Sequence, residues 1–369
     1  MFVAWRDLGF AKGRFALMGA VVVLITVLVG LLSGLTAGLG RENTSAITAL
    51  PADHLVFSAP ADGRDVAFTD SRLTERTVRA WARVPGVRHA DPLGITTTKA
   101  GAGGRTAAVA AFGVRPGSAP APAGVGDGAV VLSAKAAASL GARAQDALTL
   151  GGRTVRVAAV AGAAMYSHTP VVWTSPADWR RLAGGAGGDG ASGASGASGD
   201  RPAATVLALS TTGTAHLAAA DKALGTRTVG TGDAVRAIGS FAAENGSLQL
   251  MRGALFAISA LVVGAFFTVW TIQRGGDIAV LKALGASTRT LLRDALGQAV
   301  VLLVAGTGLG TAVAAAVGVA IGGTVPFVLA PSTVLAPALI MIALGAAGAA
   351  LAVRRITSVD PLTALGSAR

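Results

Sequence analysis

Residues 15–40 read "FALMGAVVVLITVLVGLLSGLTAGLG", and no Asp, Glu, Lys, Arg or His interrupts them. A helix crosses the hydrocarbon core of a bilayer with about 20 apolar residues, so this stretch predicts a membrane span. Residues 253–273, "GALFAISALVVGAFFTVWTIQ", form a second such stretch. The composition agrees, because 52% of the 369 residues are hydrophobic and 14% are charged, which is more apolar than an ordinary soluble domain. The chain is therefore predicted to be a membrane protein.

A third apolar stretch covers residues 295–353 and holds no charge for 59 residues. At about 1.5 Å per helical residue it is far too long for one crossing. Pro326, Pro331 and Pro337 lie near its middle, and proline tends to end helices because it lacks a backbone donor. We therefore expect spans at 295–323 and 334–353, joined by an outer turn at 324–333. With spans at 15–40 and 251–273, the chain has four predicted transmembrane α-helices.

Basic residues lie beside the predicted spans on one side of the membrane if the helices alternate. The positive-inside rule then places an N-terminal amphipathic helix (1–14), the segment 274–294 and the tail 354–369 in the cytoplasm. The first apolar run is longer than the 7–15 residues of a signal peptide, so we expect it to be retained. The predicted location is the plasma membrane, with several passes and both termini cytoplasmic. The basic residues concerned are Arg6, Lys12, Arg14, Arg274, Lys282, Arg289, Arg293, Arg354, Arg355 and Arg369.

Residues 41–250 are predicted to form a large extracytoplasmic α+β domain between the first and second membrane helices. β-branched or alternating runs predict strands at 54–59, 107–114, 154–162 and 204–210. Residues 71–84 and 133–142 look helical, with Thr74 or Ser71 as N-cap of the first. Residues 184–200, rich in Gly, Ser and Ala, predict a loop without a core. The chain has no cysteine, so the domain is stabilised without disulfides.

Gly30, Gly34 and Gly38 recur at four-residue intervals on one face of the first predicted helix. Small residues at this spacing let two helices approach closely, which predicts a packing face between helices or between subunits of a dimer. The alternative is chance, because the chain holds 51 glycines.

Motifs of catalysis are absent from the sequence. It has no G-x-x-x-x-G-K-[ST] nucleotide loop, no nucleophile elbow and no His/Glu metal spacing. A formal net charge of +12 comes largely from the membrane-flanking ends, and Tyr occurs once, so the chain lacks the basic and aromatic surface that nucleic acid needs. We expect neither an enzyme, nor a bound cofactor or metal, nor a nucleic-acid partner.

Residues 277–292, "DIAVLKALGASTRTLL", connect the second and third predicted spans. Ile278, Val280, Leu281 and Leu284 can share one apolar side of a short helix, and Gly285 can end it before a new helix starts near Ser287. A short apolar helix of this kind requires a groove on a partner.

The stretch "RGGDIAVLKALGAS" (274–287) resembles permeases of the FtsX and MacB type of ABC transporter. Those proteins carry R-x-x-E-I-A-V-L-K-A-L-G-A-S after the second of four membrane helices, and Asp277 stands here for the glutamate. The order of parts along the chain and the closing "DPLTAL" (360–365) are also similar.

This resemblance implies a permease subunit that acts as a homodimer in membrane lipid with two copies of a separate ABC ATPase, where ATP and Mg²⁺ bind. It also implies mechanotransmission, in which ATP-driven helix motion is relayed to the outer domain. For Arg274 and Lys282 taken alone, simple anchoring by positive charge is an equal alternative. The implied coupling helix uses Asp277, Ile278, Val280, Leu281, Lys282, Leu284, Gly285 and Ala286.

Residues 258–274 and 292–299 are most similar to the haem-exporter, HrtB-like branch of that family, which implies export of a hydrophobic small molecule such as haem, a lipid or an antimicrobial compound. Haem iron takes His, Tyr or Met ligands, and Met165, Tyr166 and His168 of "MYSHTP" offer them, with Glu244 just before the second span. The alternative is that these four are packing or surface residues. The competing function is a non-transporting, FtsX-like signal transducer that activates an extracellular cell-wall hydrolase. Such transducers usually have an outer domain smaller than these about 210 residues, which favours transport.

Overall fold

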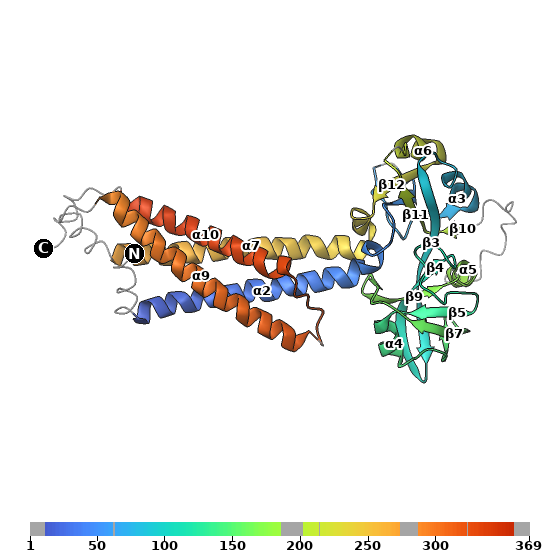
Figure 1. Cartoon of the computed structure of the whole chain (residues 1–369), viewed down its shortest axis with the longest axis horizontal. Coiled ribbons are helices and arrows are strands. Elements are labelled where there is room, and N and C mark those ends of the chain that lie inside the picture. Colours follow the sequence, from blue (N-terminus) through green and yellow to red (C-terminus); the bar gives the residue numbers. More distant parts are fainter. Residues whose placement is uncertain are drawn as a thin grey trace. The chain divides into compact units, whose positions relative to one another are not determined.

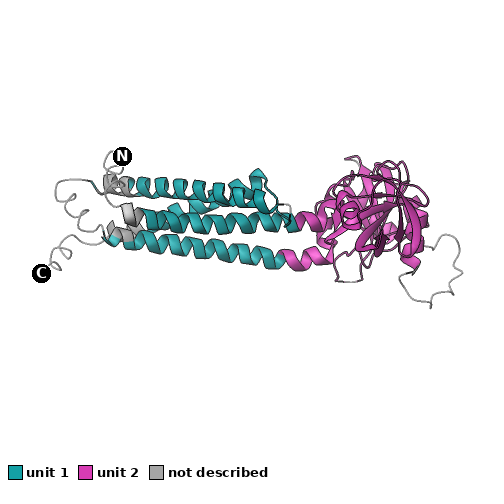
Figure 2. Ribbon diagram, turned by 90° about the horizontal axis from the view of Figure 1, so that it is seen from below, with its two compact units in different colours: residues 1–39, 246–369 teal, residues 40–245 magenta. Residues whose placement is uncertain are grey.

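The computed structural model describes residues 12–61, 63–185, 202–213, 215–273, 287–322 and 324–357. The chain divides into two compact units (Figure 2). Residues 1–39 and 246–369 form the helical unit, and residues 40–245 form the α+β unit.

Four long helices carry the apolar stretches of the sequence: α2 (Lys12–Thr48), α7 (Gly239–Gln273), α9 (Thr288–Ile321) and α10 (Pro331–Thr357). Each contains a segment long and apolar enough to cross a membrane. The prediction of four membrane helices, one before and three after the α+β domain, is therefore confirmed. α2 and α7 each run past the boundary of the helical unit, so residues 40–48 and 239–245 are helical parts of the α+β unit.

The four helices share one apolar core. α7 and α10 approach closely at two glycines, because a Cβ built on Gly348 would lie 3.2 Å from the Gly264 Cα. Small residues allow this contact between membrane helices. The buried members of the core are Met18, Val22, Val263, Phe267, Ala299, Leu302, Leu303 and Ala349.

α10 begins at a proline rather than after it. Pro331 takes the first helical position, where a missing N–H leaves no hydrogen bond unmade. The backbone N–H of Ala330 donates to Thr333 Oγ1 at 2.9 Å, which caps the helix start in the manner of a capping box. Pro337 then lies inside the helix.

Twelve strands and the shorter helices of the described chain belong to the α+β unit (Figure 1). The strands are β1 (His54–Ser58), β2 (Leu73–Thr74), β3 (Val87–Ala102), β4 (Arg105–Val114), β5 (Ala129–Leu132), β6 (Ala147–Leu150), β7 (Arg153–Val160), β8 (Met165–Tyr166), β9 (Thr169–Thr174), β10 (Pro202–Ala204), β11 (Val206–Thr211) and β12 (Thr226–Gly230). The helices are α3 (Glu75–Trp81), α4 (Ala134–Leu140), α5 (Pro176–Gly185), α6 (Leu217–Leu224) and the 3₁₀ helix η1 (Ala234–Ala237).

The main sheet has the strand order β12-β1-β11-β3-β4-β9-β5-β7-β6, and β6 pairs back onto β3. Strands β3, β4, β9, β5, β7 and β6 therefore close into a ring. Alternate side chains from all six strands, such as Val109, Val130, Leu148, Val157 and Val172, are buried in one cluster. This is the filled interior of a small barrel.

The other half of the sheet, β12-β1-β11-β3, is antiparallel. A second cluster lies on it, where Trp81 of α3 is fully buried beside Val56 and Leu207. Thr74 accepts a hydrogen bond from the Thr77 N–H at 3.3 Å and so caps α3, as the sequence predicted. The α+β class predicted for the domain is confirmed.

Candidate functional site

Three segments of the α+β unit meet in one polar cluster: the last turns of α2, the hairpin between β8 and β9, and the first turns of α7. We call this the junction cluster. It consists of Glu42, Asn43, Ser167, His168, Ser240 and Glu244.

Asn43 is the centre of the junction cluster and is 1% exposed. Its Nδ2 lies 3.1 Å from His168 Nε2 and donates to Glu244 Oε2 at 3.4 Å. Its Oδ1 accepts from Ser240 Oγ at 2.7 Å, and its main-chain carbonyl accepts from the Ser167 N–H at 3.0 Å. One buried side chain therefore joins all three segments.

The imidazole of His168 lies between two carboxylates. Nε2 is 3.0 and 2.9 Å from the two carboxylate oxygens of Glu244, and Nδ1 is 3.9 Å from Oε2 of Glu42. Lys135 of α4 pairs with Glu42 from the far side. With an Nε2 proton, His168 donates to Glu244 and ties the hairpin to α7.

The hairpin places His168 in an unusual backbone conformation. Ser167 and His168 form the two-residue turn between β8 and β9, with φ values of 48° and 61°. Such turns normally hold Asn-Gly or another glycine pair, because φ is positive at both positions. Non-glycine residues persist there only where neighbours hold them, and the junction cluster supplies those contacts. Ser167 Oγ lies 2.8 Å from Ser240 Oγ.

The four residues predicted to contact a substrate separate into two groups. His168 and Glu244 are in contact, and their side chains are 31% and 42% exposed. Met165 and Tyr166 are buried at 4% and 8% exposure, and burial raises the pKa of the Tyr166 phenol above its ordinary value. Sequence reasoning missed Asn43, which carries no signal beyond its place at the end of an apolar helix.

Tyr166 belongs to an aromatic group in the core. Its ring lies edge-on to Phe68 and Phe112, with centroids 5.7 and 5.6 Å apart. The Oγ of Ser45 in α2 accepts from the Met165 N–H at 3.0 Å, so α2 also holds β8. Among the described residues, no group of three or more His, Asp or Glu side chains is arranged to hold a metal ion.

The glycine face of α2 packs within the same chain. The Phe327 ring lies against Gly34 and Gly318, the Pro326 carbonyl lies against Gly38, and a Cβ on Gly30 would be 2.9 Å from that of Ala314. The Val328 N–H donates to the Gly34 carbonyl at 3.1 Å. These contacts seat the turn between α9 and α10 on α2, and self-association through the same face stays a prediction.

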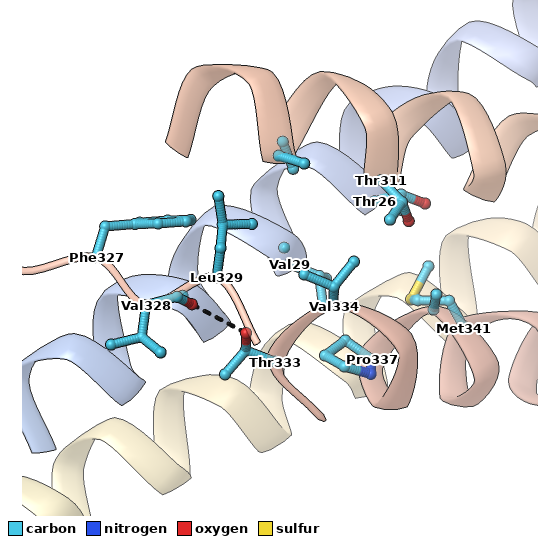
Figure 3. A pocket seen from close by; sticks show the side chains of 15 residues that line it. Thr26, Val29, Thr311, Phe327, Val328, Leu329, Thr333, Val334, Pro337 and Met341 are labelled. Carbon is cyan, nitrogen blue, oxygen red and sulfur yellow. Dashed lines mark hydrogen bonds between the residues drawn. The ribbon is translucent and has the colours of Figure 1, made fainter. Parts of the chain in front are cut away.

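Figure 3 shows this turn, with Phe327, Val328 and Thr333 close to Val29. Thr333 Oγ1 lies 2.9 Å from the Val328 carbonyl oxygen. The cavity between these residues has a volume of only about 10 Å³. It has room for about one water molecule, so it is too small for a transported ligand.

The predicted coupling helix lies outside the described residues. Its members are Asp277, Ile278, Val280, Leu281, Lys282, Leu284, Gly285 and Ala286.

Comparison with known proteins identifies the C-terminal part of the chain. Residues 251–361 match the model of the FtsX-like permease C-terminal domain. The chain is 24% identical, over 99% of both lengths, to a Staphylococcus haemolyticus protein named putative hemin transport system permease protein HrtB. It is also 25% identical, over 99% of both lengths, to an uncharacterized ABC transporter permease of Mycobacterium tuberculosis.

Two solved structures share a low similarity with part of this chain. One is the extracellular domain of the noncanonic ABC-type transporter YknZ from Gram-positive bacteria, with 13% identity, a TM-score of 0.34 and coverage of 48% of this chain and 97% of that one. The other is the periplasmic region of MacB from Actinobacillus actinomycetemcomitans, with 10% identity, a TM-score of 0.35 and coverage of 53% and 94%. Residues 251–361 are therefore an FtsX-like permease C-terminal domain, and the chain as a whole, with its four apolar helices, is similar over its full length to proteins named as membrane permeases.

Proposed function

We propose that this chain is the membrane subunit of an ABC transporter that exports a hydrophobic small molecule, with haem as the first candidate. The observation that carries the proposal is the full-length similarity to a permease named for hemin transport, together with the FtsX-like domain. Two copies of the permease would work with two copies of a separate ATPase, which binds ATP and Mg²⁺.

The junction cluster suggests how ATP-driven motion would reach the α+β unit. α2 and α7 each extend from an apolar segment into that unit. There the Asn43 carbonyl of α2 accepts from the Ser167 N–H and the Glu244 carboxylate of α7 contacts His168, so both helices bind the same hairpin. A change in the relative position of the two helix ends would therefore be felt directly at the hairpin, as mechanotransmission requires.

His168 and Glu244 are also the residues available for a substrate. Their half-exposed side chains offer one imidazole nitrogen and one carboxylate, and imidazole is a common axial ligand of haem iron. Met165 and Tyr166 are packed in the core, so we do not assign them to the exported substrate.

ATP turnover of the permease–ATPase complex in lipid nanodiscs tests this function. Haem, a lipid and a peptide antimicrobial are presented in turn, and a complex with an ATPase-dead partner serves as the blank. We expect at least one of these compounds, and haem before the others, to stimulate turnover. Turnover that responds to none of them, while an extracellular cell-wall hydrolase is activated, would instead establish the signal transducer.

The proposed orientation places both termini and residues 274–294 in the cytoplasm and the α+β unit outside. The chain has no cysteine, so Gly190→Cys and Thr288→Cys can be labelled separately in intact cells with an impermeant thiol reagent. We expect labelling at position 190 and protection at position 288. The reverse pattern would invert the orientation.

A further inference from the structure

A cleft of about 700 Å³ opens in the α+β unit beside the barrel. Its walls come from β3, β8, α5 and the residues before β2. The residues that decide its chemistry are Phe68, Arg72, Ile95, Tyr166, Trp179 and Arg180. The volume lies within the range of small-molecule sites, and none of these residues belongs to the junction cluster.

The position of Trp179 in this wall is fixed by two paired glycines. Gly94 of β3 and Gly113 of β4 face each other across the strands, and a Cβ on either would overlap the Trp179 side chain. The indole therefore lies directly against bare backbone and is 3% exposed. A site built on strands with a ring locked in this way is rigid before any ligand arrives.

One buried polar group of the wall lacks a hydrogen-bond partner: Trp179 Nε1 has none among the described residues. The Tyr166 side chain, which carries a hydroxyl, also lines this wall. A buried donor without a partner is costly, and in a native protein it indicates a place that a ligand or water satisfies.

The cleft is positively charged. Arg72 Nη1 donates to the carbonyls of Thr69 and Ser71 at 3.0 Å each, which holds the guanidinium while Nη2 and Nε remain available. Arg180 makes one long contact, 3.5 Å, with Glu75. No acidic side chain is among the described residues that line the cleft.

We propose that this cleft is a binding site for a small apolar, ring-containing molecule that carries one carboxylate or equivalent acid. The aromatic wall takes the apolar body, the two arginines take the acid, and the Trp179 N–H and the Tyr166 hydroxyl supply directional hydrogen bonds. Arginine pairs geometrically with carboxylates. A neutral molecule would gain no charge-assisted hydrogen bond from the guanidinium groups, and a cation would be repelled. The proposal does not rest on the export function.

The full-length chain in lipid nanodiscs is titrated with 2-naphthoate by ligand-observed NMR. The neutral isostere 2-naphthamide is the matched ligand, and empty nanodiscs give the lipid background. The loss of one charge-assisted pair should weaken binding about tenfold, so naphthoate should bind at least that much more tightly than the amide.

Four variants locate the site. Arg72→Gln and Arg180→Gln should each weaken naphthoate binding about tenfold and leave the amide unaffected. Trp179→Phe keeps a ring in the glycine slot, and Tyr166→Phe removes only the hydroxyl, so each should weaken binding a few-fold. Arg153→Gln, at an exposed arginine of β7 that does not line the cleft, is the control and should bind like the wild type.

Circular dichroism of every variant should match that of the wild-type chain, which separates loss of binding from loss of fold. The proposal is overturned if naphthoate and naphthamide bind equally. It is also overturned if neither arginine variant changes the affinity, or if Arg153→Gln reduces it as much as they do.

Discussion

His168 Nε2 lies 2.9 Å from Oε2 of Glu244, and this contact joins a strained two-residue turn to the start of a helix that continues into an apolar segment. The two residues are 76 positions apart, and both are half exposed. The contact is therefore worth little as a source of stability. Its importance is that it links the hairpin between β8 and β9 to α7.

A double-mutant cycle measures the His168–Glu244 contact. His168→Asn keeps a residue that tolerates positive φ, and Glu244→Gln keeps the side-chain size. We expect a coupling of about 0.5 kcal/mol, because exposed pairs are screened by solvent. Hydrogen exchange of the β8 and β9 amides gives the free energies. Strictly additive effects would show that the two side chains do not interact.

Asn43→Ala should be more damaging than either of those changes. Asn43 is buried and bonded to Ser240, Glu244 and, through its carbonyl, Ser167, and its Nδ2 lies 3.1 Å from His168 Nε2. Removing its side chain leaves the Ser240 hydroxyl and the Glu244 carboxylate without this partner, which should lower the free energy of unfolding by about 2 kcal/mol. Exchange of the hairpin amides should accelerate accordingly. A change no larger than that of Glu244→Gln would contradict the central position of Asn43.

Because Tyr166 is buried, we expect the folded chain to lose stability in alkali. Burial raises the pKa of its phenol, whereas the unfolded chain ionises near the ordinary value of about 10. Above that value the unfolded state has lost a proton that the folded state keeps, so the free energy of unfolding falls as the pH rises.

Tyr166→Phe should remove this part of the pH dependence. Thermal unfolding midpoints between neutral pH and strong alkali are compared for the two proteins. Because Tyr166 is the chain's single tyrosine, tyrosinate absorbance reports its ionisation directly. Ionisation of the folded wild type at the ordinary tyrosine pKa would contradict the buried position.

Gly38→Ala should destabilise the helical unit. Its Cβ would overlap the Pro326 carbonyl, whereas a Cβ on Gly19 of the same helix meets nothing within 4 Å. Overpacking of a close contact costs about 2 kcal/mol, and the backbone of the turn cannot rotate away as a side chain would. The thermal unfolding midpoint in nanodiscs should therefore be lower than that of the wild type for Gly38→Ala and unchanged for Gly19→Ala. Equal midpoints would argue against the docked turn.

Measuring the oligomeric state of a Gly34→Leu variant distinguishes two roles of the α2 glycine face: packing within the chain and contact between subunits. Gly34→Leu would displace Phe327 within the chain and would also block a second copy. Mass measured in mild detergent distinguishes these effects. Retained dimer with a lowered midpoint would assign the face to packing within the chain, and loss of dimer would assign it to the subunit contact.

The membrane helices could be predicted from the sequence because lipid imposes a simple length and polarity rule. Runs such as 15–40 and 295–353 admit few alternatives. Strands with alternating or continuous apolar residues, such as β1 and β11, were also foreseen. β3 was not, because Pro92, Asp91 and Lys99 interrupt its pattern. It is held by partners on both sides, β4 and β11, which no local pattern reveals.

The junction cluster could be predicted only in part. His168 and Glu244 were selected for their chemistry, but their contact depends on a turn in which Ser167 and His168 replace the usual Asn-Gly. The hydrogen bonds of Asn43 depend on the three segments coming together. The arginine cleft gave no sequence signal either, since Arg72 and Arg180 are far apart in the chain and meet through the fold.

The central claim is that a separate ATPase drives this permease through residues 277–286, and Leu284→Asp tests it most directly. A carboxylate placed in an apolar groove without a partner is strongly unfavourable. On a free loop the same aspartate side chain would face water and cost little. Val160→Asp, at an exposed apolar position of β7, introduces the same charge elsewhere. Co-purification with the ATPase and ATP turnover in lipid nanodiscs are measured for the wild type and both variants. The account predicts that Leu284→Asp loses association or turnover while Val160→Asp behaves like the wild type. Equal association and turnover in all three proteins would contradict it.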